Sequence, residues 1–318
     1  MVKTHQNPIP IEPSPESVRL LHRMRGARKG MARIKAGGPS LWSYRLMMNA
    51  IGMTARPPKG GYVKSVRTDS GVRGRMVAGP QADQGNGILI WVHGGGLVSG
   101  SPQLEQGIAV AYAEQAQIPV FLPKYRLAPE HVFPAAADDV LAAYRYVLDQ
   151  GVPAEKIRLG AMSAGASLVI GLLGDLGRED LPMPAAVVLV SPMIVLSGEA
   201  ATARDAERPD PTSDPSFIVR TNLAYAGGTP LTHPRLDHLA ADMTSWPPIL
   251  VQAGEDECIA ADAELLGAAM HAAGRHCEVQ LWPGQVHGFP GIGYRNVPEA
   301  KLAVEYGARF LAEIPVRS

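Results

Sequence analysis

The chain has 318 residues, with 30 basic and 30 acidic side chains, and its formal net charge at pH 7 is +0. This balance gives no overall field that would attract nucleic acid or an anionic membrane, and a hydrophobic content of 46% excludes an intrinsically disordered chain. An uncharged or weakly charged small substrate fits better, and the length allows one large α/β domain with a small lid.

The first ten residues have neither the apolar core nor the small-residue cleavage site of a secretion signal, and no apolar run reaches the length that spans a membrane. We therefore expect a cytoplasmic protein with no integral membrane association. Cys258 and Cys277 lack the CxxC spacing of a zinc or redox motif, so we expect them to be buried and reduced.

Residues 1–55 are predicted to form an N-terminal helical cap segment. Ser14, Pro15 and Glu16 are typical of a helix start. Seven arginines and lysines lie between positions 19 and 35. They indicate a patch that binds nucleic acid or a membrane, or alternatively a solvated helix face. The zero net charge of the whole chain favours the solvated helix face. The methionine-rich stretch 41–48 fits either core or a lid over a pocket, and its position before the first strand favours a lid.

From residue 62 onward, short apolar runs alternate with helical stretches. Strands are expected at residues 62–68, 73–79, 87–92, 120–124, 157–162, 186–190, 249–253 and 278–282, and helices at 135–149, 164–176 and 261–273. This alternation predicts an α/β fold with a mostly parallel sheet of about eight strands, helices on both faces, and a ligand site at the carboxyl ends of the strands. Residues 197–246 interrupt the pattern and are predicted to be a cap insertion in a catalytic domain at 56–318.

His93, Gly94, Gly95 and Gly96 follow the strand expected at 87–92. Consecutive glycines let the backbone turn without a Cβ in the way, so amide N–H groups can point into a site. An oxyanion hole needs such donors where negative charge develops on a carbonyl oxygen. We expect the N–H groups of Gly95 and Gly96 to serve in this way, and the alternative is a plain glycine turn.

Ser163 lies at the corner between the strand at 157–162 and the helix that follows, which makes it the candidate nucleophile. The pattern alone is weak evidence, because small residues occur around a serine by chance in a chain with 34 glycines and many alanines. The N–H of Ala164 lies at the helix start and is a third candidate oxyanion donor.

A serine hydroxyl becomes a good nucleophile only when a histidine takes its proton and an acid orients that histidine. Of the nine histidines, His287 alone follows a strand in a glycine-flanked loop. The acid is expected in the loop after the strand at 249–253, where Glu255, Asp256 and Glu257 are the candidates. Asp262 is expected to cap the next helix.

Residues 125–139 complete a recognisable order of motifs. The HGGG loop, the stretch Tyr-Arg-Leu-Ala-Pro-Glu-His at 125–131 and the serine elbow make the chain resemble the hormone-sensitive-lipase-like branch of the α/β-hydrolase esterases, over about residues 60 to 312. The resemblance implies the α/β-hydrolase fold and favours Glu257 over Asp256 as the acid. Arg126, Glu130 and Asp138 are expected to tie their loop to its surroundings by ion pairs, and His131 to be structural.

The resemblance also implies a serine ester hydrolase that acts on short to medium acyl esters through an acyl-enzyme, with no metal or cofactor. A lactone hydrolase on the same triad is an alternative, and an inactive ligand receptor on this fold is a second. A homodimer through the last strand and the helix at about 298–311 is suggested by analogy.

The serine elbow departs from the family pattern at two positions. Ala161 replaces the usual glycine and Met162 replaces a frequent aspartate. Both changes leave the nucleophile in place, but Met162 removes a polar contact and is expected to reshape the pocket wall. Leu97, Met162 and Phe289 are the residues predicted to line the substrate pocket.

Overall fold

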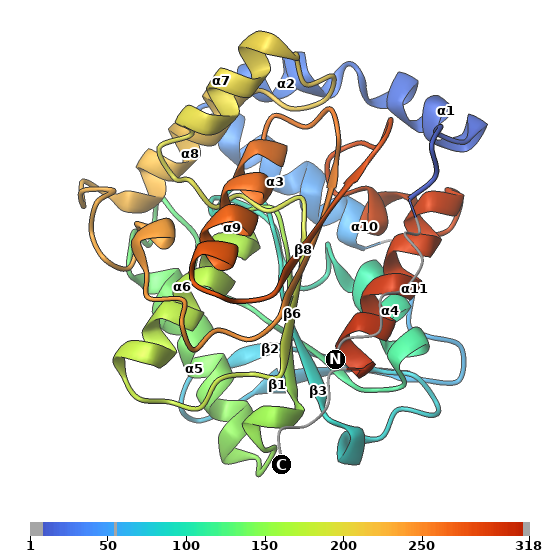
Figure 1. Cartoon of the computed structure of the whole chain (residues 1–318), viewed down its shortest axis with the longest axis vertical. Coiled ribbons are helices and arrows are strands. Elements are labelled where there is room, and N and C mark those ends of the chain that lie inside the picture. The colour runs from blue at the N-terminus through green and yellow to red at the C-terminus, as the bar shows by residue number, and fades with distance from the viewer. Residues whose placement is uncertain (1–8, 54–55, 314–318) are drawn as a thin grey trace.

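The computed structural model describes residues 9–53 and 56–313, and its centre is one eight-stranded sheet (Figure 1). The strand order is β1-β2-β4-β3-β5-β6-β7-β8, in which β1 pairs with β2 and β2 with β4 antiparallel, and all other neighbours are parallel. The strands are β1 (Tyr62–Arg67), β2 (Arg73–Ala78), β3 (Ile88–Val92), β4 (Val120–Pro123), β5 (Ile157–Met162), β6 (Ala186–Val190), β7 (Ile249–Gly254) and β8 (Cys277–Trp282). The predicted mostly parallel sheet is confirmed.

Helices cover both faces of the sheet, as the apolar strands require. In β3, Ile90 and Val92 pack in one core cluster, whereas Leu89 and Trp91 pack in another on the opposite face. Figure 1 shows α5, α6 and α9 on one side of the strands and α4 and α11 on the other. These helices are α4 (Gln106–Ala116), α5 (Ala135–Asp149), α6 (Ala164–Arg178), α9 (Ala260–Ala272) and α11 (Pro298–Glu313), with short 3-10 turns at Gln84–Asn86 and Ala154–Lys156.

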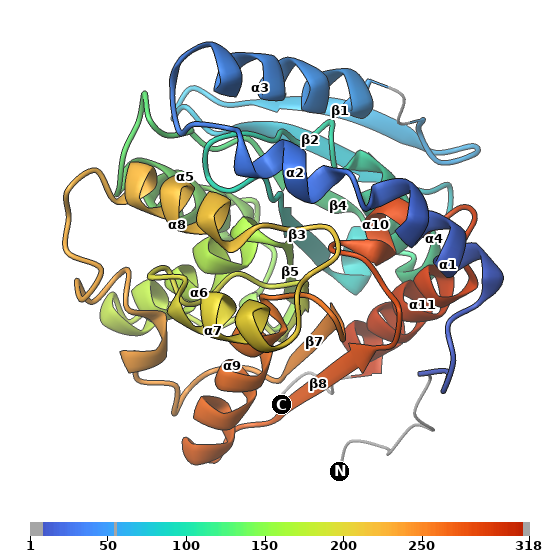
Figure 2. The ribbon, with the colours of Figure 1, turned by 90° about the horizontal axis from the view of Figure 1, so that it is seen from above.

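Five further helices lie toward the end of the molecule that is uppermost in Figure 1, where α2 and α3 lie beside α7 and α8, and α1 lies next to α11 (Figure 2). Arg28 of α2 forms an ion pair with Asp205 of α7 at 2.6 Å, and Arg220 of α8 donates to the carbonyl of Ala32. Two segments far apart in the sequence therefore form one cover. These helices are α1 (Pro15–Met24), α2 (Ala27–Ala32), α3 (Gly38–Gly52), α7 (Glu199–Glu207) and α8 (Pro215–Ala226). The short α10 (Phe289–Gly293) packs against α11 and α4, and the 3-10 turn His238–Ala240 packs against α6 and α9.

Most element bounds agree with the sequence prediction to within two residues, and Ser14 caps α1 by accepting the N–H of Ser17 at 3.2 Å. Cys258 and Cys277 are free and buried, as predicted. The division into a cap segment at 1–55 and a catalytic domain at 56–318 stays a prediction, and residues 1–8, 54–55 and 314–318 of it lie outside the described residues. Among the described helices, none combines the length and the apolar character needed to cross a membrane.

Candidate active site

Ser163 is held at a strained corner where β5 passes into α6. Its φ of 54° and ψ of −125° lie outside the regions that a residue with a side chain prefers, and its N–H donates to the carbonyl of Val190 at 2.9 Å. The helix approaches β3 so closely that a Cβ on Gly165 would stand 2.2 Å from the carbonyl oxygen of Val92. Only glycine fits at that position, and the tight approach fixes the serine at the carboxyl end of the sheet.

The structure brings Ser163, His287 and Glu257 into one hydrogen-bonded row. Ser163 Oγ lies 3.0 Å from His287 Nε2, and His287 Nδ1 lies 2.8 Å from Glu257 Oε2. Since a carboxylate accepts only, Nδ1 carries the proton and Nε2 is left as the acceptor for the serine hydroxyl. The histidine side chain keeps 27% of its surface exposed, whereas the glutamate keeps 1%.

Glu257 is fixed by the loop after β6 and by the end of its own strand, β7. Its Oε1 accepts the hydroxyl of Ser191 at 2.7 Å and the N–H of Gly254 at 2.6 Å, and Ser191 Oγ in turn accepts the N–H of Gly288 at 2.9 Å. Ser191 thus joins the acid to the backbone beside His287. The sequence interpretation missed it, although a polar residue directly after the buried strand β6 was the available signal.

The other two candidates for the acid, Glu255 and Asp256, both form ion pairs with Arg208, whereas His287 binds Glu257. Asp262 was predicted to cap α9, and that prediction is wrong: its Oδ2 accepts the N–H groups of Ile194 and Val195 at 2.7 and 2.9 Å. Because α9 begins at Ala260, Asp262 is a residue of the first helical turn and does not precede the helix. Its side chain reaches across to the loop after β6.

The pKa of His287 is raised above its ordinary value of 6.5. Burial lowers this pKa, but the hydrogen bond and the charge of Glu257 raise it by more. The neutral imidazole, which is the form able to take a proton from Ser163, therefore predominates only at a higher pH than for a free histidine.

The glycine loop after β3 presents free donors beside the serine. Gly95 and Gly96 have φ values of 120° and 66°, a backbone conformation that side chains disfavour. Within residues 9–53 and 56–313, no hydrogen bond engages the N–H groups of Gly95, Gly96 or Ala164. The three N–H groups predicted as oxyanion donors therefore have no partner among the described residues, and their role stays a prediction.

The stretch at 125–131 packs against the start of the glycine loop through Tyr125 and His93. The Tyr125 ring stacks on His93 with centroids 4.1 Å apart, and the Tyr125 hydroxyl donates to the His93 carbonyl at 2.7 Å. Burial lowers the pKa of His93 to about 4, so its ring is neutral. The expected ion pairs are present, since Arg126 binds Asp139, Glu130 binds Arg45 and Asp138 binds Arg235, whereas His131 is exposed.

A second buried carboxylate, Glu105, supports the glycine loop and was missed by the sequence interpretation. Its Oε1 accepts the N–H of Gly94 and its Oε2 accepts the indole N–H of Trp91, both at 2.6 Å. Burial raises the pKa of Glu105 to about 7. No motif in the sequence distinguishes this glutamate from a surface acid, because its role depends on the fold that buries it.

The predicted pocket residues differ in accessibility. Met162 is half-buried, and its Sδ would lie 2.8 Å from a Cβ on Gly288, so the thioether packs under the loop of His287. Leu97 and Phe289 are fully buried, and Phe289 packs against Trp282 with ring centroids 5.4 Å apart. Their assignment to the substrate pocket stays a prediction.

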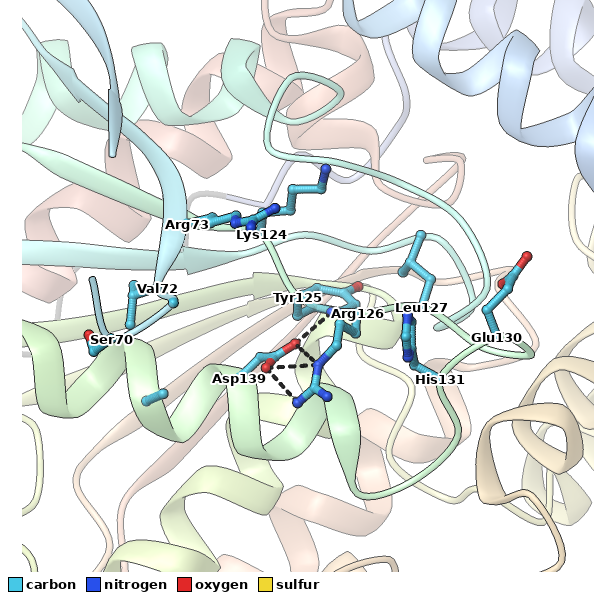
Figure 3. Close-up of a pocket in the computed structure, with 12 residues that line it drawn as sticks. Ser70, Val72, Arg73, Lys124, Tyr125, Arg126, Leu127, Glu130, His131 and Asp139 are labelled. Carbon is cyan, nitrogen blue, oxygen red and sulfur yellow. Dashed lines mark hydrogen bonds and ion pairs between the residues drawn. The ribbon is translucent and has the colours of Figure 1, made fainter. Parts of the chain in front are cut away.

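A cavity of about 700 Å³ lies outside this row of residues (Figure 3). It is bounded by the start of β2 and by the loop after β4, with Arg73, Lys124 and Tyr125 in its lining. Figure 3 shows the Arg126–Asp139 ion pair at its edge. Tyr125 connects the lining of this cavity to the glycine loop, since its hydroxyl donates to the His93 carbonyl.

Comparison with known proteins agrees with the fold and with the motifs. A family described as the alpha/beta hydrolase fold matches residues 89–291. An acetyl-hydrolase of Streptomyces hygroscopicus is 34% identical over 230 residues, which cover 72% of this chain and 77% of that protein. The esterase LipU of Mycobacterium tuberculosis is 30% identical over 249 residues, covering 73% and 80%. The crystal structure of an esterase from the bacterial hormone-sensitive lipase family superposes with a TM-score of 0.85 at 28% identity, covering 96% of this chain and 99% of that one.

Separate replacement of Glu257 and Asp256 by their amides should distinguish the roles of these two acids. Glu257→Gln is expected to lower kcat/KM by about 10³-fold or more, because the histidine loses its orienting carboxylate. Asp256→Asn should leave kcat/KM near the wild-type value. In a pH profile, activity should rise as His287 loses its proton, with a midpoint above 6.5 in the wild type and in Asp256→Asn, and a lower midpoint in Glu257→Gln. Loss of activity in Asp256→Asn alone would contradict the observed geometry.

Glu105→Gln tests the second carboxylate. The amide offers one acceptor oxygen to two buried N–H groups, so the free energy of unfolding should fall by about 1–3 kcal/mol and kcat should fall as the glycine loop loosens. Because the pKa of Glu105 is raised to about 7 in the folded chain, the folded state holds a proton that the unfolded state releases above the ordinary value of 4.5. This group therefore makes unfolding easier as pH rises from 4.5 to 7, a slope that Glu105→Gln should lack. The control is Glu114→Gln on the exposed side of α4, and equal behaviour of the two variants would refute the role.

Proposed function

The chain belongs to the α/β-hydrolase family and is a carboxylic ester hydrolase, and we propose that Ser163 is its nucleophile, His287 its general base and Glu257 the acid that orients the histidine. The single observation that carries this assignment is the row of hydrogen bonds from Ser163 Oγ through His287 to Glu257, at 3.0 and 2.8 Å. The motif order of the hormone-sensitive-lipase-like branch supports the same three residues.

In the proposed mechanism, Nε2 of His287 takes the hydroxyl proton of Ser163 while Oγ attacks the ester carbonyl carbon. The resulting oxyanion accepts hydrogen bonds from the N–H groups of Gly95, Gly96 and Ala164. Collapse of this intermediate breaks the bond to the alcohol, which leaves with the proton from His287, and the acyl group stays on Ser163. Water then attacks the acyl-enzyme with His287 as base, releasing the acid and restoring the serine.

Short to medium acyl esters are the proposed substrates. The groups nearest Gly96 are the ring of Phe217 and the hydroxyl of Thr221, which a Cβ on that glycine would meet at 3.4 and 3.3 Å. Both belong to α8, so the cap supplies an uncharged wall close to the reacting carbonyl. A lactone would use the same groups, since it differs from an open ester only in that its leaving alcohol stays attached.

The homodimer and the cytoplasmic location remain predictions. Since β8 is the last strand of the sheet order, it offers its outer edge to a second copy, and α11 follows it in the chain. The small-molecule ester is the only partner that the proposed mechanism requires.

A series of p-nitrophenyl esters tests the proposal. The wild type is expected to hydrolyse acetate and butyrate esters faster than long-chain esters, and Ser163→Ala should lose about 10⁴-fold or more in kcat. Circular dichroism of both proteins controls for folding. Absence of hydrolysis by the folded wild type, as for an inactive receptor, or equal hydrolysis by both proteins would refute the proposal.

A further inference from the structure

Helix α3 turns an uncharged, apolar side to the surface. Its large exposed side chains include Trp42, Leu46, Met47 and Ile51, followed by Met53 just after the helix, and their exposed fractions lie between 52% and 84%. Arg45 is the only charged residue from Gly38 to Gly52, and it lies on the other side, where it donates to the Val98 carbonyl at 2.6 Å and binds Glu130 at 2.7 Å. A soluble surface helix normally carries charge on its outer side, so this face is suited to contact with an apolar surface.

The neighbouring helices are strongly basic. Residues 9–53 contain eight arginines and lysines against two acids, in a chain whose net charge is zero. Arg19, Arg28 and Arg45 have carboxylate partners. In the described part of the chain, no ion pair engages the other five, which are exposed: Arg23, Arg25, Lys29, Arg33 and Lys35. The cap therefore combines a positive charge with an apolar helix.

The apolar helix is connected to the site by a short series of contacts. Tyr44 of α3 packs edge-on against Phe217 of α8, with ring centroids 5.8 Å apart, and Phe217 lies beside Gly96 of the glycine loop. Figures 1 and 2 show α1, α2 and α3 at the same end of the molecule, with α2 next to α8. A surface bound to this end would therefore lie on the side of the molecule that leads through Tyr44 and Phe217 to the glycine loop.

We propose that the cap is a docking surface for an anionic phospholipid bilayer, with the outer side of α3 in the boundary between headgroups and acyl chains and the five unpaired cations at the headgroups. Amphipathic helices that lie in a membrane interface combine these two features, and tryptophan favours that depth. This inference rests on the proposed function, because it gives an apolar ester dissolved in the membrane a direct route to Ser163.

The positive charge of the cap and the apolar side of α3 distinguish among the partners that could cover this surface. A second copy of this chain packed on the same face would bring two basic caps together, and their like charges would repel. Nucleic acid would satisfy the cations but would leave the exposed apolar side chains of α3 in water. An anionic bilayer matches both the charge and the apolar side, and a dimer through β8 and α11 would leave α3 uncovered, because α3 lies on the opposite side of the molecule from β8 (Figure 2).

Binding is measured by co-sedimentation with sucrose-loaded vesicles made of equal parts phosphatidylglycerol and phosphatidylcholine, and with vesicles of phosphatidylcholine alone. The wild type should bind the anionic vesicles and bind them less at high ionic strength. Trp42→Ser with Leu46→Ser, and separately Arg23→Gln with Lys29→Gln and Arg33→Gln, should each weaken binding by about tenfold or more. Leu265→Gln and Lys301→Gln, which change exposed residues of α9 and α11, are the matched controls and should bind like the wild type.

Tryptophan fluorescence locates the contact. Trp91, Trp246 and Trp282 are fully buried, whereas Trp42 is 67% exposed, so a blue shift on addition of anionic vesicles reports Trp42 alone. The shift should vanish in Trp42→Phe, which keeps an apolar side chain and should still sediment with the vesicles.

The proposal is overturned if the wild type does not sediment with anionic vesicles, or if the cap variants bind as well as the controls. It is also overturned if Trp42→Ser with Leu46→Ser converts a dimer in solution to a monomer, because a second copy would then cover α3. Hydrolysis of p-nitrophenyl acetate without vesicles distinguishes a failure of membrane binding from a failure of the proposed ester hydrolysis. The cap variants should keep that activity, whereas Ser163→Ala should lose it and still bind vesicles.

Discussion

The active site depends on one constraint, the common direction of the parallel strands β3, β5, β7 and β8. Their carboxyl ends meet at the same edge of the sheet, so the loops that follow them carry Gly95, Ser163, Glu257 and His287 to one place from four distant parts of the sequence. Hydrogen bonds between neighbouring strands fix this arrangement; for example, Met162 of β5 is paired with Val190 of β6. The geometry of the site is therefore a property of the sheet more than of any single loop.

Buried polar groups then hold these loops at the correct distances. Ser191 joins the loop of Glu257 to that of His287, and Glu105 binds the backbone of Gly94 within the glycine loop. Buried acceptors and donors of this kind are costly to leave unpaired, so each network favours one conformation of the loop that it contacts. Glu105 lies close enough for its charge to raise the pKa of His287, which links the support of the glycine loop to the titration of the base.

The strands and the main catalytic candidates were predictable because they produce local patterns. Buried parallel strands appear as apolar runs, and Ser163 and His287 follow such runs in glycine-rich contexts. Helix α4 was not predicted, because it is apolar on most of its sides and lacks the helical periodicity of an amphipathic helix. The roles of Ser191 and Glu105 and the inward direction of Asp262 depend on contacts between residues far apart in the sequence, which no local pattern encodes. The basic cluster at 19–35 was interpreted as a solvated face; only the fold places it at the same end of the molecule as the uncharged side of α3.

Covalent labelling with diethyl p-nitrophenyl phosphate, followed by mass spectrometry of the intact chain and of its peptides, tests directly whether Ser163 is the activated nucleophile. In this reaction Oγ of an activated serine bonds to phosphorus and p-nitrophenolate leaves. We expect one diethylphosphoryl group per chain, located on Ser163, with ester hydrolysis lost in proportion to the label. A label on another residue, or full hydrolytic activity in the completely labelled protein, would show that Ser163 is not the nucleophile.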